Sequence, residues 1–128
     1  MSKTVLVIDD EKDMVFGLQM MFEANNFEVV TAFDGQEALN KARQIKPDII
    51  ILDLMLPKID GYRVCRMLKF DEKYRKTPII MLTARTSAED KKIGMDVGAD
   101  AYVVKPFDQQ VFMAKVTELL KQAAVPNP

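Results

Sequence analysis

Short apolar runs alternate along this chain with longer segments of helical periodicity. The first run, Thr4–Ile8, is β-branched, apolar at consecutive positions and followed by acids. Such runs are typical of strands that are buried on both faces of a parallel sheet. We predict five strands, at residues 4–8, 27–32, 49–52, 79–82 and 101–104.

The segments between these runs carry apolar residues at helical spacing. We predict helices at about residues 14–25, through Ala38, Ala42 and Ile45 up to Pro47, around Val64, Met67 and Leu68, at about 88–97, and at about 108–122. Asp13 is the expected N-cap of the first helix. Asn25–Asn26 is its expected end, and Gly98 should close the fourth helix.

This order gives five consecutive strand–helix units with no internal domain boundary. Parallel strands need crossover connections, and right-handed crossovers cover both faces of the sheet with helices. The pattern therefore predicts an open, doubly wound α/β sandwich. We expect one domain over residues 1–122, with residues 123–128 as a frayed terminus or the start of a linker.

Composition narrows the functional class. The chain has 128 residues, 48% hydrophobic and 29% charged, with scattered basic residues and a net charge of −1, so we expect no direct nucleic-acid binding. It lacks a run of about 20 apolar residues for a membrane helix. A cleavable signal sequence is not evident and Cys65 is the single cysteine, so we expect a cytoplasmic location. With no histidine, the chain has neither a histidine metal ligand nor the usual base of a catalytic triad.

Polar side chains follow four of the five predicted strands. Asp9 and Asp10 follow the first strand, Asp53 the third, Thr83 the fourth and Lys105 the fifth. Binding sites in open parallel sheets form outside the carboxyl ends of the strands. These groups would therefore meet in one pocket if the first strand lies beside the third.

Such a pocket would need a cation. Two carboxylates about 5 Å apart repel by roughly 3 kcal/mol at an effective dielectric constant near 20. Lys105 cannot balance three carboxylates, and hard oxygen ligands suit Mg²⁺ or Mn²⁺. Taken singly, Asp10 fits a helix cap, Thr83 a turn and Lys105 a solvated surface. Their joint placement favours a functional site.

Five motifs in this order resemble the receiver domain of two-component response regulators. They are Val7-Ile8-Asp9-Asp10, Asp53-Leu54-Met55-Leu56-Pro57 with Asp60-Gly61, Met81-Leu82-Thr83-Ala84, Gly98-Ala99-Asp100-Ala101-Tyr102 and Lys105-Pro106-Phe107. The resemblance runs from about Lys3 to Leu120. It implies a flavodoxin-like fold with strand order 2-1-3-4-5.

The resemblance also assigns a chemistry. It implies that Asp53 accepts a phosphoryl group from a phosphohistidine of a sensor histidine kinase or phosphotransfer protein. Mg²⁺ would be bound by Asp10, Asp53 and the Met55 carbonyl, with Asp9 acting through a water.

The remaining residues of the motifs receive supporting roles. Lys105 and Thr83 would contact phosphoryl oxygens, Ala84 would leave room for them, and a cis bond before Pro106 would aim the lysine. Thr83 and Tyr102 would then switch the conformation. The fourth helix, fifth strand and fifth helix would present the result to an effector.

Two rival functions remain open. A phosphatase with an aspartate nucleophile usually has a second aspartate two residues later, where this chain has Met55. A receiver-like scaffold that is never phosphorylated would be expected to lack an acid, the threonine or the lysine, and none is missing. Because the output is conformational, we interpret the chain as a signalling domain and not as an enzyme.

Overall fold

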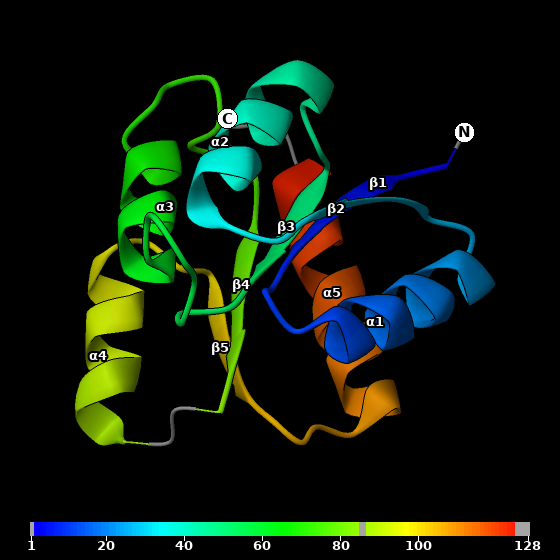
Figure 1. Ribbon diagram of the computed structural model, residues 1–128. Coiled ribbons are helices and arrows are strands. Elements are labelled where there is room, and N and C mark those ends of the chain that lie inside the picture. Colours follow the sequence, from blue (N-terminus) through cyan, green and yellow to red (C-terminus); the bar gives the residue numbers. More distant parts are fainter. Residues whose placement is uncertain (1, 85–86, 125–128) are drawn as a thin grey trace.

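The computed structural model describes residues 2–84 and 87–124 and has a parallel sheet at its centre (Figure 1). The sheet order is β2-β1-β3-β4-β5, which confirms the predicted topology. Its strands are β1 (Thr4–Ile8), β2 (Glu28–Ala32), β3 (Ile49–Leu52), β4 (Ile79–Thr83) and β5 (Ala101–Val104). Every adjacent pair of strands is parallel. Strand β4 includes Thr83, one residue more than predicted.

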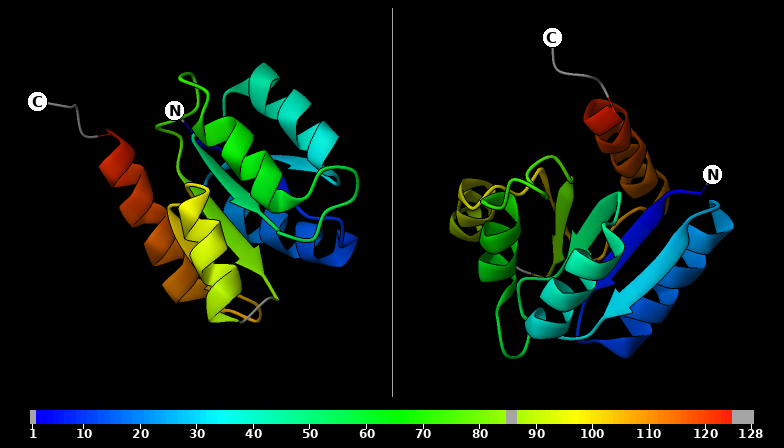
Figure 2. Two further views of the ribbon diagram at one scale, coloured as in Figure 1. Left: turned by 90° about the vertical axis from the view of Figure 1, so that its left-hand side faces the viewer. Right: turned by 90° about the horizontal axis from the view of Figure 1, so that it is seen from above.

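Helices connect the strands and cover both faces of the sheet. They are α1 (Lys12–Ala24), α2 (Gly35–Ile45), α3 (Gly61–Lys69), α4 (Ala88–Asp96) and α5 (Gln109–Ala124). Figure 1 shows α1 and α5 on one side of the sheet and α2, α3 and α4 on the other, and Figure 2 shows the same layers from two further directions. No helix within residues 2–84 and 87–124 is long and apolar enough to cross a membrane.

Two apolar layers hold the helices to the sheet. Val15, Leu18 and Phe22 of α1 pack with α5 against one face of the sheet. On the other face, α2 and α3 pack in a cluster that includes Val64 and Cys65. Both central strands, β3 and β4, are buried along their whole length, as their uninterrupted apolar sequence predicts.

Local signals explain most helix ends. Asp34, Asp60 and Ser87 each accept a backbone N–H at the start of α2, α3 and α4. Gly98 follows α4 with a φ of +103°, a left-handed conformation that favours glycine. The predicted N-cap Asp13 was wrong: α1 begins at Lys12, after Glu11.

The physical reason for this early start lies in the preceding loop. Glu11 has the extended backbone of an N-cap but makes no side-chain cap bond. Its backbone N–H instead donates to the Asp9 carboxylate at 2.9 Å. At the other end of the chain, α5 runs two residues beyond the predicted Gln122, to Ala124. The rest of the predicted tail, residues 125–128, lies outside the described part of the chain.

Candidate functional site

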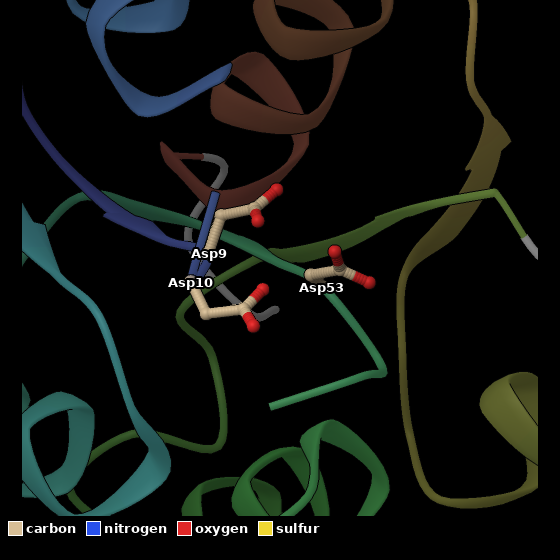
Figure 3. A group of neighbouring side chains, drawn as sticks. All are labelled: Asp9, Asp10 and Asp53. Atoms are coloured by element: carbon tan, nitrogen blue, oxygen red, sulfur yellow. The ribbon is translucent and has the colours of Figure 1, made fainter. Parts of the chain in front are cut away.

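Three carboxylates gather at the carboxyl edge of β1 and β3. One oxygen from each of Asp9, Asp10 and Asp53 lies within 4.8 Å of the others (Figure 3). Pairing of β1 with β3 brings these segments together, and the Asp53 N–H donates to the Ile8 carbonyl at 3.0 Å. The predicted convergence of the acids is therefore present.

Lys105 reaches the same cluster from the end of β5. Its Nζ lies 2.7 Å from an Asp9 oxygen and 3.1 Å from an Asp53 oxygen. Asp9 and Asp53 are only 2% and 7% exposed, whereas Asp10 is open to solvent. The ammonium thus lies between the two buried acids, and the peptide bond between Lys105 and Pro106 is cis.

Burial and neighbouring charges shift the pKa values of Asp9 and Lys105. Burial raises the pKa of Asp9 above its ordinary value, and hydrogen bonds from Lys105 and from the Glu11 N–H oppose that rise. For Lys105, burial alone would lower the pKa, but the hydrogen bond to Asp9 and the negative charge of Asp53 outweigh it. The pKa of Lys105 is therefore raised. The lysine stays protonated and compensates one negative charge.

The cluster opens into a hollow of about 510 Å³. Its lining includes the backbone or side chains of Asp10, Glu11, Asp53, Met55, Leu56, Pro57, Thr83, Ala84 and Lys105. Thr83 is buried and Ala84 is exposed. The predicted groups Met55, Thr83 and Ala84 thus face the same space as the acids. Glu11 also lines it; this acid follows Asp9 and Asp10 in the first motif, and no site role was predicted for it.

Three predicted site residues do not line this hollow: Asp9, Pro106 and Tyr102. Asp9 is buried behind it, against Lys105. Pro106 follows Lys105 and is exposed. Tyr102 is half-buried and packs with Met81 in the apolar layer that faces α2 and α3. Thr83 lies two residues beyond Met81 in β4, so it faces the same side of the sheet as Tyr102.

The donor set fits a hard divalent cation. Octahedral ligands of Mg²⁺ at about 2.1 Å lie roughly 3 to 4 Å from one another, so oxygens within 4.8 Å need only small shifts. Asp53 is also held in place, because the Met55 N–H donates to its Oδ1 at 3.2 Å. With one ammonium against three acids, the pocket has two negative charges left for a cation to balance.

A family model described as "Response regulator receiver domain" matches residues 5–117. The chain belongs to this family. The receiver domain is also 44% identical over 128 residues to the alkaline phosphatase synthesis transcriptional regulatory protein PhoP of Bacillus subtilis. It is 40% identical over 118 residues, 92% of its length, to the response regulator ArlR of Staphylococcus aureus. It spans about half of these curated relatives, 52% of each.

Solved structures agree with this assignment. The receiver domain superimposes on the chemotaxis response regulator CheY4 of Vibrio cholerae with a TM-score of 0.87 and 34% identity, over 93% of this chain and 99% of that one. It matches the receiver domain of the Francisella response regulator 1452 with a TM-score of 0.86 and 35% identity, over 94% and 98% of the two chains. Family, fold and acidic cluster are thus consistent with a phosphorylation-dependent signalling domain.

Proposed function

We propose that this receiver domain is a switch that accepts a phosphoryl group on Asp53. The observation that carries the proposal is the position of the Lys105 ammonium, between the carboxylates of Asp9 and Asp53. A carboxylate that is fixed, nearly buried and beside a permanent positive charge is suited to attack phosphorus.

The donor is a phosphohistidine of a sensor histidine kinase or phosphotransfer protein. An Asp53 oxygen forms the new bond to phosphorus, the phosphorus–nitrogen bond breaks, and the imidazole leaves with the electron pair of that bond. Lys105 pairs with one phosphoryl oxygen and the Thr83 hydroxyl donates to another. The small side chain of Ala84 leaves room for the group at the mouth of the hollow.

Mg²⁺ is the expected cofactor, and Mn²⁺ is an alternative with the same ligand preference. Asp10, Asp53 and the backbone carbonyl of Met55 would hold the ion, with Asp9 acting through a water. When bound, the cation offsets the charge of the incoming phosphoryl oxygens. Asp10 is exposed and Asp9 buried, which agrees with a direct role for the first and an indirect role for the second.

The output is conformational. Thr83 and Tyr102 lie on the same face of neighbouring strands, so a phosphoryl group that draws the Thr83 hydroxyl inward leaves space toward which the Tyr102 ring can turn. This shift favours one of two pre-existing states. The surface of α4, β5 and α5 then meets an effector, and exposed Ile93, Met95, Val104 and Val111 lie on these elements or their ends. A cytoplasmic location is part of the proposal.

Acetyl phosphate tests the chemistry directly. We expect intact-mass analysis to show one phosphoryl adduct when Mg²⁺ is present, and none with EDTA or with Asp53→Asn. Asp13→Asn, an exposed acid outside the cluster, is the matched control and should be phosphorylated normally. An adduct on Asp53→Asn would place the phosphoacceptor at another residue, and no adduct on the unmodified chain would favour the scaffold. Continuous phosphate release from a phosphomonoester would favour the phosphatase.

A further inference from the structure

The outward side of α3 and of its C-cap residue, Phe70, carries four side chains that the proposed chemistry does not use. They are Arg63, Arg66, Met67 and Phe70, at the i, i+3, i+4 and i+7 positions of one helical face, and we call them the α3 stripe. They line a shallow hollow together. Phe70 is 77% exposed, the highest value among the exposed large hydrophobic residues of the described chain, and Met67 is 46% exposed. Figure 2 (left) shows α3 from the outside.

Both arginines of the stripe lack a carboxylate partner among residues 2–84 and 87–124. The guanidinium carbon of Arg66 lies 5.8 Å from the ring centroid of Phe70, a cation–π contact that keeps charge and ring together. By contrast, the neighbouring Lys69 has partners within the chain, because its Nζ lies 2.7 Å from an Asp100 carboxylate oxygen and 2.6 Å from the Thr77 carbonyl oxygen. The stripe thus offers positive charge and apolar area that the described chain leaves unused.

We propose that the α3 stripe is a docking surface for an acidic amphipathic helix of a partner protein. Arginine, methionine and aromatic residues are the types enriched in protein interfaces. A guanidinium binds a carboxylate through two parallel hydrogen bonds, so carboxylates on the partner match Arg63 and Arg66. Apolar side chains between those carboxylates would cover Met67 and Phe70.

The secondary structure of the stripe selects a helix as the occupant. A helix has no free backbone edge along its length, so an extended peptide cannot add to it as a strand. A second helix can place its side-chain ridges between those of α3. The stripe covers two turns, enough for such a crossing.

Two other occupants fit less well. In a symmetric contact between two copies, the arginines of one stripe would face those of the other and repel. An anionic membrane would meet the carboxylates of Asp60 before α3 and of Asp71 and Glu72 after it. These acids lie at the two ends of α3, so a partner helix that crosses between the ends meets Arg66 and Met67 first.

Fluorescence anisotropy can test this with two matched probes. One is a fluorescein-labelled helical peptide of roughly 16 residues, with leucines on one face flanked by glutamates, and the other has lysine at every glutamate position. We expect the 1–128 chain to bind the glutamate peptide only. Arg66→Gln and Phe70→Ala should each raise the dissociation constant about tenfold or more. The control Phe16→Ala, 64% exposed on α1, should leave it unchanged.

Because the substituted positions are exposed, we expect all variants to fold normally. Circular dichroism and phosphorylation of Asp53 by acetyl phosphate would check this. The proposal is overturned by equal binding of both peptides, by no binding at about 1 mM chain, or by an unchanged dissociation constant for Phe70→Ala. It is also overturned if Arg66→Gln abolishes binding to phosphatidylglycerol vesicles while the glutamate peptide stays unbound, or if Phe70→Ala abolishes self-association of the chain. Because phosphorylation is measured separately, failure here leaves the proposed function standing.

Discussion

Gly94 of α4 lies against the ring of Tyr102 in β5. A Cβ at position 94 would come within 3.0 Å of the Tyr102 Cδ2 and 3.2 Å of its Cε2. The missing side chain therefore makes room for the tyrosine ring under α4. This contact joins the proposed switch residue to the helix that would carry its signal.

Replacing Gly94 by alanine should have opposite effects in two backgrounds. Alanine is favoured over glycine in a helix by about 1 kcal/mol, but with Tyr102 present the crowding should outweigh this gain and lower the free energy of unfolding by about 1 kcal/mol. In Tyr102→Ala the crowding is gone, so Gly94→Ala should stabilise by about 1 kcal/mol. Urea denaturation of the four proteins measures this cycle, and additive effects would show that the two residues do not interact.

Gly17 gives a simpler prediction, because a Cβ at this position of α1 meets nothing within 4 Å. Gly17→Ala should raise the free energy of unfolding by about 0.5–1 kcal/mol, because alanine lowers the entropy of the unfolded chain and has a higher helix propensity.

Gly61 should behave in the opposite way, because a Cβ at this position would overlap the Asp53 carbonyl oxygen. Gly61→Ala should therefore destabilise by about 2 kcal/mol or more, and equal effects at both positions would contradict the packing around Gly61.

Much of this architecture was predictable because an uninterrupted apolar run indicates a strand that is buried on both faces. The runs at Ile49–Leu52 and Ile79–Thr83 are apolar at every position but the last of β4, and both strands are central. The meeting of Asp9, Asp53 and Lys105 was also predictable, since parallel strands end at one edge of a sheet.

Contacts between helices could not be predicted from the sequence. The Tyr62 hydroxyl lies 3.1 Å from the Asp90 carbonyl oxygen, joining α3 to the first turn of α4. Lys69 ties α3 to Asp100 after α4. Both pairs depend on how α3 and α4 lie beside each other, which helical periodicity does not specify. The start of α1 was missed for a similar reason, because the Asp9 carboxylate binds the Glu11 N–H from outside the helix.

Magnesium should reverse the stability effect of Asp10→Asn. In EDTA, removing one of three neighbouring carboxylates should stabilise the chain by about 0.5–1 kcal/mol, a modest value because Asp10 is exposed and screened. At a Mg²⁺ concentration about ten times the dissociation constant, the unmodified chain gains about 1.4 kcal/mol that the variant largely lacks. Thermal denaturation in both buffers measures this, with Asp13→Asn as control. An identical Mg²⁺ response of both variants would contradict a role for Asp10 in metal binding.

Met55 should slow the loss of a phosphoryl group from Asp53. Its exposed, apolar side chain stands at the hollow, where an asparagine amide could orient water toward phosphorus. We expect Met55→Asn to lose the group roughly 3- to 10-fold faster, equivalent to at most about 1.4 kcal/mol in the barrier. An intact-mass time course after donor removal measures the rate. Met67→Asn, an exposed methionine on α3, is the control, and equal rates for all three proteins would refute the idea.

Cys65 should resist alkylation in the native state. The thiol is fully buried, and burial raises its pKa to about 12, so almost no thiolate exists at pH 8. Iodoacetamide should label it only on unfolding, as followed by mass with and without urea. Because the pKa is raised in the folded state, the free energy of unfolding should fall as pH rises from about 9 toward 12. Rapid native labelling at pH 8 would contradict the buried position.

The central place of β3 has a consequence for how a signal can leave Asp53. This strand is hydrogen-bonded to β1 on one side and β4 on the other, and Asp53 follows it directly. Phosphorylation at Asp53 could move β3 only by breaking its backbone hydrogen bonds to both neighbouring strands. We therefore expect β1, β3 and β4 to stay in place, whereas the edge strand β5 and helix α4 are freer to rearrange. Substitutions in β5 and α4 could therefore adapt the chain to different effectors while the chemistry at Asp53 stays unchanged.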